Sequence, residues 1–378
     1  MTGIPWQWRR DTKAKNDAFT GAEGEVTIDK ETPALRLHDG LTVGGFPIRS
    51  YDQELENIQD VVDAIQDEVS ERPPENYLIN GDFVVAQRGT SFTIAASGSA
   101  YILDRWLVTN DTDQSVTVDQ SEVTLGQTDI PGNPRYKVQL TFATAPTSGT
   151  IRVEQRVEGV QKLAGKTATA RGYFYGPTGA ETLAAEVVQN FGTGGSPSSE
   201  VTAGATSLDV ATIYNSSSMA RSAVFNVPSI SGMTYGSNGD DYLALAWELS
   251  PRQAGIYEIA HMSLVEGDAS SETDTFEPRS DGIEILLCQR YYWQGDADDQ
   301  GLSYLYASAS SGMQGPVASF QTEMRTEPTA SILTAPTYSS CSSGSLVSSK
   351  RGLAHRLTVT SAGTYRALQG IYEADAEL

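Results

Sequence analysis

Residues 51–69 read YDQELENIQDVVDAIQDEV, and apolar side chains recur along this stretch at alternating intervals of four and three residues. This spacing is a heptad pattern, which places one apolar stripe along a helix and is typical of a coiled-coil seam. The other positions are mostly acidic residues and amides. Pro73 and Pro74 follow, and proline ends a helix because it lacks an N–H donor and clashes with the preceding turn. The stretch therefore predicts a short helical stalk between two differently built parts of the chain.

The composition of this seam favours three parallel strands. Ile58 and Ile65 occupy d positions of the heptad, where isoleucine packs poorly in a parallel dimer and better in trimers or tetramers. The alternative is an amphipathic helix that packs on its own domain, because the run is shorter than the three to four heptads that define a coiled coil firmly. The residues predicted to hold the trimer together are Leu55, Ile58, Val62, Ile65 and Val69.

A small β module precedes the stalk. The alternating runs Glu25–Ile28 and Ala34–Leu37 flank Asp29–Pro33, which predicts a hairpin with a longer loop. So small a hairpin cannot bury its apolar face alone, and packing between chains would cover it. Four cations lie near the start, but no apolar segment follows them, so we do not expect a signal peptide. These cations are Arg9, Arg10, Lys13 and Lys15.

The residues after the stalk are predicted to be β throughout. Ser115–Val118 and Thr150–Glu154 alternate between polar and apolar side chains, and glycine, proline, asparagine and serine mark turns between such runs. The pattern of Ile283–Arg290 predicts the start of a short helix, and further strands are expected after it. The predicted fold is mainly β, with an N-terminal hairpin module over residues 1–50, a short parallel trimeric coiled coil over 51–72, a jelly-roll β-sandwich over 73–282 and a C-terminal β-sandwich over 283–378.

Charge and composition exclude several classes of partner. The chain has 26 basic and 48 acidic residues and a net charge of -22, which repels nucleic-acid backbones and anionic membrane surfaces. No apolar run reaches the roughly 18 residues of a membrane span. The two cysteines are too few for a secreted disulfide scaffold. We therefore expect neither nucleic-acid binding nor membrane insertion.

No motif for catalysis, a metal or a cofactor stands out. The three histidines lie in different segments and form no zinc-binding pattern. Asp240–Asp241 and Asp296–Asp299 lack the complete ligand spacing of a calcium loop, and solvated acidic turns are the simpler interpretation. We expect no enzyme, no metal and no cofactor, although composition alone leaves a pair of catalytic carboxylates open.

Aromatic residues gather just after the boundary at residue 282. Flat rings with polar handles stack on sugar faces, so this cluster is a candidate glycan-binding platform. The same enrichment also marks the core of a domain or subunit interface, and both interpretations stay open. Separately, Arg88 and Arg105 are expected to form buried ion pairs with Asp82 and Asp104, and the tryptophan after Arg105 to lie in the core. The candidate platform consists of Tyr291, Tyr292, Trp293, Tyr304 and Tyr306.

The order of several short motifs resembles tailed-bacteriophage tail fibre and appendage proteins that carry a jelly roll similar to carbohydrate-binding modules. The resemblance touches both ends and the middle of the chain. Its motifs are Gly24–Val26, Leu35–Gly40, Gly44–Gly45, Asn76–Phe83, Gln87–Gly89, Asp104–Trp106, Leu264–Gly267, Phe276–Arg279, Cys288–Tyr292, Met324–Thr329 and Ala374–Leu378.

This resemblance implies a structural subunit of the virion, assembled in the host cytoplasm, that mediates adsorption to a host-surface glycan. The four N-terminal cations would then dock to other virion proteins, and the chain would be a homotrimer. The alternatives within this class are a head-decorating fibre or a baseplate component without a receptor role. Two further alternatives are a polysaccharide depolymerase and a secreted bacterial carbohydrate-binding module.

Overall fold

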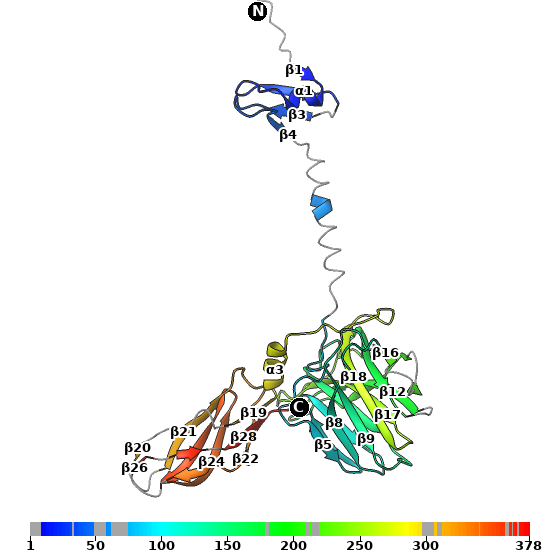
Figure 1. Cartoon of the computed structure of the whole chain (residues 1–378), viewed down its shortest axis with the longest axis vertical. Helices are drawn as coiled ribbons and strands as arrows, with labels where there is room; N and C mark the ends of the chain where they lie inside the picture. The colour runs from blue at the N-terminus through cyan, green and yellow to red at the C-terminus, as the bar shows by residue number, and fades with distance from the viewer. Residues whose placement is uncertain are drawn as a thin grey trace, which may run out of the picture. The chain divides into compact units, whose positions relative to one another are not determined.

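The computed structural model describes residues 9–31, 34–48, 58–61, 75–177, 181–208, 212–213, 219–296, 306–307, 312–339, 341–359, 363–364, 366–368 and 370–378. The chain divides into two compact units, Met1–Pro73 and Pro74–Leu378, and each is described by itself (Figure 1). Within the described residues, no helix is both long and apolar enough to cross a bilayer.

The first unit is a four-stranded sheet with one short helix. Strands β2 and β3 pair antiparallel, which confirms the predicted hairpin, and β1 pairs with β2 in parallel. The helix α1 (Lys13–Asp17) lies between β1 and β2 in the chain. The order in the sheet is β1 (Arg9–Asp11), β2 (Val26–Asp29), β3 (Ala34–Leu37) and β4 (Phe46–Ile48).

The interior of this sheet is polar and its outside carries apolar side chains. Thr27 and His38 are buried and joined by a hydrogen bond of 3.0 Å between Oγ1 and Nε2. By contrast, Leu41 is 84% exposed and Phe46 54% exposed in the single chain. A module with its apolar groups outward leaves them for another surface to cover, and packing between chains at this surface stays a prediction.

Most of the heptad stretch lies outside the described residues. Within it, residues 58–61 are helical, and Ile58 is 59% and Val61 58% exposed. The coiled coil and the trimer therefore stay predictions.

The second unit contains two seven-stranded antiparallel sheets packed face to face (Figure 1). The first sheet consists, in order, of β13 (Val201–Gly204), β12 (Glu181–Asn190), β17 (Tyr242–Ser250), β10 (Ile151–Glu158), β7 (Trp106–Asn110) and β6 (Gly98–Ile102), with β15 (Thr212–Ile213) paired to β12. The second consists of β14 (Ser207–Leu208), β16 (Met219–Asn226), β11 (Thr167–Tyr175), β18 (Gly255–Glu266), β9 (Tyr136–Phe142), β8 (Val116–Glu122) and β5 (Ser91–Ile94).

One large core fills the space between these sheets. Alternate side chains of β10 point inward, so Ile151 and Val153 are fully buried while Arg152 between them reaches the outer face. Trp106 and Trp247 are both 0% exposed, which confirms that the first of them is a core residue; its Nε1 donates to the carbonyl of Asn80 at 2.9 Å. This architecture agrees with the predicted jelly-roll sandwich.

Gly149, at the entry to β10, is a position that admits only glycine. Its φ is +82°, and an added Cβ would lie 2.0 Å from the carbonyl oxygen of Asp111. Gly126 has a similar φ of +80° but open space around it. We expect Gly149→Ala to lower the free energy of unfolding by about 2 kcal/mol more than Gly126→Ala, because only the first adds a clash to the backbone strain. Urea titration of both variants tests this, and equal losses would contradict it.

The remaining strands follow the short helix α3 (Asp281–Gln289), which confirms the helix expected there. They form a sheet of β19 (Tyr292–Asp296), β28 (Ile371–Asp375) and β22 (Thr329–Thr334), and another of β21 (Gly312–Ser319), β25 (Gly352–Val359) and β24 (Cys341–Ser349). Two short pairs join β20 (Tyr306–Ala307) to β26 (Gly363–Thr364) and β23 (Thr337–Ser339) to β27 (Arg366–Leu368). Their small core contains Met324, Leu353 and Tyr372.

Candidate functional site

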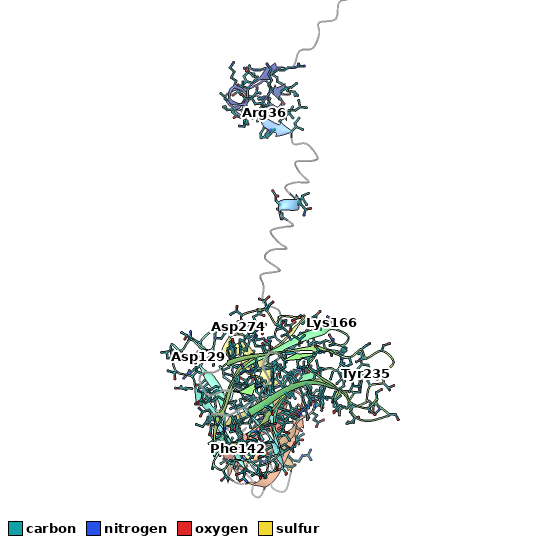
Figure 2. The ribbon with its side chains drawn as sticks, turned by 90° about the vertical axis from the view of Figure 1, so that its right-hand side faces the viewer. Arg36, Asp129, Phe142, Lys166, Tyr235 and Asp274 are labelled. Atoms are coloured by element: carbon teal, nitrogen blue, oxygen red, sulfur yellow. The ribbon has the colours of Figure 1, made fainter. Side chains whose placement is uncertain are left out.

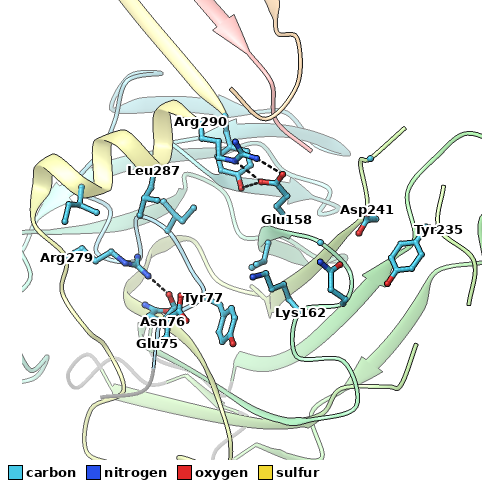
Figure 3. Close-up of a pocket in the computed structure, with 17 residues that line it drawn as sticks. Glu75, Asn76, Tyr77, Glu158, Lys162, Tyr235, Asp241, Arg279, Leu287 and Arg290 are labelled. Carbon is cyan, nitrogen blue, oxygen red and sulfur yellow. Dashed lines mark hydrogen bonds and ion pairs between the residues drawn. The ribbon is translucent and has the colours of Figure 1, made fainter. Parts of the chain in front are cut away.

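A cleft of about 1010 Å³ lies between the sandwich and α3. Four segments enclose it: the chain leading into the sandwich from residue 75, the turn after β10, the loop before β17, and the helix (Figure 3). This volume is at the upper end of the roughly 300–1,000 Å³ that small-ligand pockets occupy.

Two tyrosines and a lysine give the cleft its open polar side. Tyr77 is partly exposed and Tyr235, at the edge of the sandwich in Figure 2, is 46% exposed. Lys162 also lines the cleft, and its ammonium group forms no ion pair within the described part of the chain. Figure 3 shows these side chains reaching the same space from separate segments. The arrangement offers two flat rings and a free ammonium group to a ligand.

The turn that carries Lys162 is held in place from the opposite loop. The Oδ2 atom of Asp241 accepts a hydrogen bond of 2.8 Å from the backbone N–H of Val160, and its carbonyl accepts one of 3.0 Å from Gly159. Gly159 has a φ of +92°, a conformation that favours glycine. The cleft is therefore built on fixed backbone rather than on a free loop.

An ion pair forms the back of the cleft. The guanidinium of Arg290 donates to both carboxylate oxygens of Glu158 at 2.7 and 2.9 Å, and the hydroxyl of Tyr291 donates to the same carboxylate at 3.1 Å. Burial raises the pKa of Glu158, but the hydrogen bonds and charge of Arg290 outweigh it and hold that pKa below its usual value. Glu158 is therefore ionised at neutral pH and has no proton to give as a general acid.

The structure places two residues of the predicted aromatic platform in the interior. Tyr291 is 4% and Tyr292 2% exposed, so neither ring is accessible to a sugar. The guanidinium carbon of Arg105 lies 3.4 Å from the ring centre of Tyr291, and that of Arg88 lies 3.7 Å from Tyr292. These two tyrosines form a domain core, which was the alternative interpretation.

Of the other three members of the platform, Trp293 has a described side chain. Trp293 is partly buried and packs against Phe320 at 5.4 Å between ring centres. Tyr304 lies outside the described residues, and Tyr306 belongs to β20, of which only the backbone is described. The exposed aromatic groups of the cleft, Tyr77 and Tyr235, were missed because each stands alone in the sequence.

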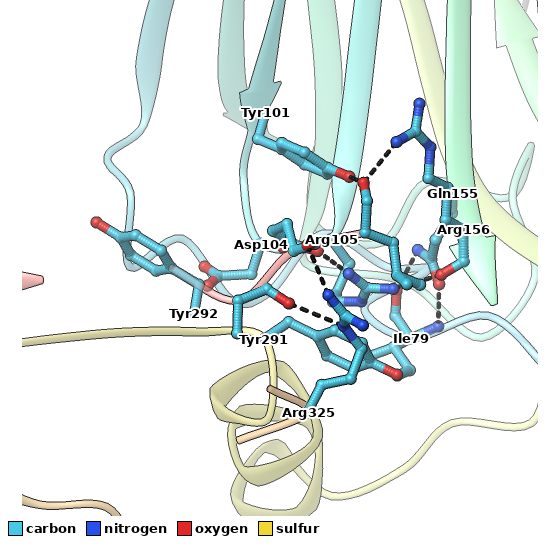
Figure 4. Close-up of polar contacts among 12 residues, drawn as sticks. Ile79, Tyr101, Asp104, Arg105, Gln155, Arg156, Tyr291, Tyr292 and Arg325 are labelled. Atoms are coloured by element: carbon cyan, nitrogen blue, oxygen red, sulfur yellow. Dashed lines mark hydrogen bonds and ion pairs between the residues drawn. The ribbon is translucent and has the colours of Figure 1, made fainter. Parts of the chain in front are cut away.

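The expected buried ion pairs exist, but their partners are different. Arg88 pairs with Asp375 at 2.9 Å and with Glu377 at 3.2 Å, and Arg105 pairs with Glu377. Figure 4 shows Tyr101, Arg105, Arg156 and Arg325 converging on the last residues of the chain. Arg88 and Arg105 are more than 270 residues from the carboxylates that pair with them, and no local pattern could have connected them.

The two aspartates expected to pair with these arginines have other roles. Asp104 accepts hydrogen bonds from the backbone N–H and the side-chain amide of Gln87 at 2.6 and 2.8 Å. Asp82 accepts from Nδ1 of His261 at 2.7 Å, and the other ring nitrogen of His261 lies 3.2 Å from Asp274. The prediction of Asp82 and Asp104 as partners of Arg88 and Arg105 was wrong.

The N-terminal cations lie among carboxylates. Arg9 lies 3.8 Å from Asp11, Lys15 3.4 Å from Asp11, and Lys13 2.7 Å from Asp17. Arg10 is exposed in β1 and forms no ion pair with the residues that the structure describes. The surface is therefore of mixed charge, and docking to the virion through these cations stays a prediction.

In the described part of the acidic turns, carboxylates accept hydrogen bonds from the chain itself. Asp240 accepts from the backbone N–H of Thr193 at 2.7 Å and from its hydroxyl. In the described ranges, no three histidine, cysteine, aspartate or glutamate side chains gather in a way that suits a metal ion. Residues 297–299 of the second acidic run lie outside those ranges.

The N-terminal segment of the chain matches a known family of domains. Residues 7–42 match the Major tropism determinant N-terminal domain. The particular relative is a tail fiber receptor-binding protein of Bordetella phage BPP-1, 44% identical over 46 residues, which are 12% of this chain and 12% of that protein. These matches confirm the resemblance to phage tail fibres, and they cover only a small part of either protein.

Solved structures resemble the second unit only distantly. The carbohydrate-binding module TmCBM61, solved with β-1,4-galactotriose, is 14% identical with a TM-score of 0.29, over 51% of this chain and 99% of the module. A putative sugar binding protein from Bacteroides thetaiotaomicron is 11% identical with a TM-score of 0.33, over 51% and 100%. Tailspike protein 4 of bacteriophage CBA120 is 13% identical with a TM-score of 0.28, over 51% and 21%. Scores of this size do not define a shared fold, and the sandwich is defined by its own strand pairing.

Proposed function

We propose that this chain is a subunit of a trimeric phage tail fibre and that it adsorbs to the host surface by binding a glycan in the cleft. The observation that carries this proposal is the match of the N-terminal segment to a domain of a phage tail fibre receptor-binding protein. In this proposal, the first unit attaches to the virion, the heptad of residues 51–69 joins three copies, and the second unit meets the host.

The chemistry of the cleft supports a sugar ligand. Sugars present apolar C–H faces and a rim of hydroxyl groups, and Tyr77 and Tyr235 offer rings for the faces while Gln161 and Lys162 offer polar groups for the hydroxyls. The charged groups at the back, Glu158 and Arg290, already satisfy each other. Three such clefts on one fibre would turn weak single contacts into firm adhesion.

Substitutions in the cleft test this site. We expect Tyr235→Ala and Lys162→Ala each to weaken binding to host surface glycan by roughly tenfold, because each removes one stacking or polar contact. The control is Lys166→Ala, whose ammonium is exposed, pairs with Glu266 at 2.7 Å and lies outside the cleft. A glycan array followed by titration of the bound sugar measures the effect. Unchanged binding in both cleft variants would exclude the cleft as the site.

We also propose that the chain binds without cleaving. The proposal rests on Glu158, whose carboxylate is ionised and accepts hydrogen bonds from Arg290. An ionised carboxylate that is already paired is unsuited to acid catalysis. Incubating the pure protein with host surface polysaccharide and measuring released oligosaccharides distinguishes this from a depolymerase. Immunogold electron microscopy of virions separates a tail fibre from a head fibre or a baseplate component.

A further inference from the structure

Four of the side chains that line the cleft are aliphatic. Ile283 and Leu287 lie about one turn apart on α3, so they share one face of the helix. Ile79 comes from the segment that leads into the sandwich, and Val157 lies near the end of β10. Ile283 is 52% exposed and the other three are partly exposed, so a ligand in the cleft can touch all of them. We call these four residues the aliphatic wall.

Hydrogen bonds hold the three elements of the aliphatic wall side by side. The backbone N–H of Ile79 donates to the side chain of Gln155 on β10 at 2.7 Å, and the amide of Gln155 donates to the carbonyl of Ile79 at 2.7 Å. Arg279, just before α3, donates to the carbonyl of Leu78 at 2.9 Å and to the carboxylate of Glu284 on the helix at 3.1 Å. The wall is therefore formed before a ligand arrives.

The polar groups that hold the wall are already used within the chain. Gln155 takes both backbone groups of Ile79, and the guanidinium of Arg279 donates to two carbonyls and to Glu284. A sugar hydroxyl placed against the wall would lose its hydrogen bonds to water and gain none there, which disfavours binding. A methyl group in the same place is favoured, because apolar area is removed from water.

The polar groups that remain for a ligand come from other segments of the cleft. Gln161 and Lys162 lie on the turn after β10, and Tyr235 lies on the loop before β17. The ammonium group of Lys162 has three donors and no ion pair among the described residues. Figure 3 shows Lys162 and Leu287 reaching the cleft from separate elements. A ligand that fits both has hydroxyl groups at one edge and an apolar group at another.

We infer that the cleft selects a sugar that carries a methyl group, either at carbon 6 of a 6-deoxyhexose or in an N-acetyl group. The methyl group packs on the aliphatic wall, while ring hydroxyls meet Gln161 and Lys162. The parent hexose has a hydroxyl group in that place, for which the wall offers no partner. The inference rests on the proposed function, because it names the class of glycan that the same cleft binds.

Matched pairs of sugars measure this selectivity. D-fucose differs from D-galactose by a methyl group in place of the hydroxymethyl group, and N-acetyl-D-glucosamine differs from D-glucose by an acetamido group in place of a hydroxyl. The full chain is titrated with each sugar, and saturation-transfer NMR shows which ligand protons touch the protein. We expect the methyl-bearing sugar of at least one pair to bind roughly tenfold more tightly, with its methyl protons saturated most strongly. The pair that responds identifies the source of the methyl group.

Two isoleucines of α3 provide the variant and its matched control. Ile283 lines the cleft, whereas Ile285, which is 37% exposed, does not line it. We expect Ile283→Ala to lower the preference for the methyl-bearing sugar roughly fivefold, because part of the wall is removed. Ile285→Ala should keep the wild-type preference. Both side chains are exposed, so both variants should fold, and circular dichroism checks this.

Each remaining outcome counts against a stated part of the argument. Equal affinities within both pairs, in a chain whose binding still depends on Tyr235 and Lys162, overturn the methyl selectivity and leave the glycan cleft intact. Array glycans that bind yet carry neither kind of methyl group do the same, and so do equal effects of the two isoleucine variants. A chain that binds none of the four sugars and no glycan of the array overturns both the inference and the proposed function.

Discussion

Glu377→Ala is expected to lower the free energy of unfolding by about 3–5 kcal/mol, because it leaves a buried cation without its partner. Arg105 is 1% exposed, its guanidinium pairs with Glu377, and the carboxylate of Glu377 is itself 4% exposed. Solvent cannot replace the lost charge at such depth. Urea titration followed by tryptophan fluorescence measures the loss, since Trp106 and Trp247 lie in the sandwich core.

Two other acidic residues provide the controls for this variant. Asp375 also pairs with Arg88, but its side chain is 37% exposed, so Asp375→Ala should cost about 1 kcal/mol or less. Glu327 is exposed on the C-terminal domain, and Glu327→Ala should be neutral within about 0.5 kcal/mol. A loss below about 1 kcal/mol for Glu377→Ala would mean that water reaches Arg105 and that its ion pair with Glu377 is not buried.

Raising the pH through about 9 is expected to remove roughly 3 kcal/mol of stability that His261 provides. Burial lowers the pKa of this histidine, but hydrogen bonds to Asp274 and Asp82 outweigh burial and raise it to about 9. The folded pKa therefore exceeds the unfolded value of 6.5. The stabilisation is fully present below pH 6.5 and is lost as the pH rises to about 9.

Substitutions at this site separate its pH dependence from that of other groups. His261→Gln cannot take up a proton, so its free energy of unfolding should change little between pH 6.5 and 9. Asp274→Asn removes one of the two carboxylates and should shift the loss toward lower pH. Unfolding is measured at several pH values with the same tryptophan signal. A wild-type curve that is flat over this range would show that His261 is neutral in the folded chain.

Local sequence patterns were sufficient for the repeating parts of the fold. Alternation in Glu25–Ile28 and Ala34–Leu37 predicts the hairpin that β2 and β3 form, and the same pattern in Thr150–Glu154 predicts the strand that is β10. Short patterns work here because the period of a strand is a local property.

The candidate site could not be predicted because its parts meet only after folding. Tyr77 and Tyr235 come from distant segments, and each is an ordinary isolated tyrosine in the sequence. His261 has a φ of +54° at an irregularity between β11 and β18, and nothing in its neighbourhood indicates two carboxylates around it. The dense cluster at 291–293 attracted the prediction of a sugar platform, yet two of its rings support arginines in the interior.

The buried pair at Glu377 also limits how this protein can be taken apart. Residues 371–375 are the middle strand of a sheet, and the two residues after them supply the counter-charge for Arg88 and Arg105 in the sandwich. A fragment ending at residue 282 would carry both arginines with that counter-charge removed. Workers who want a smaller piece for crystallisation or for building a chimera should keep residues 75–378 as one piece.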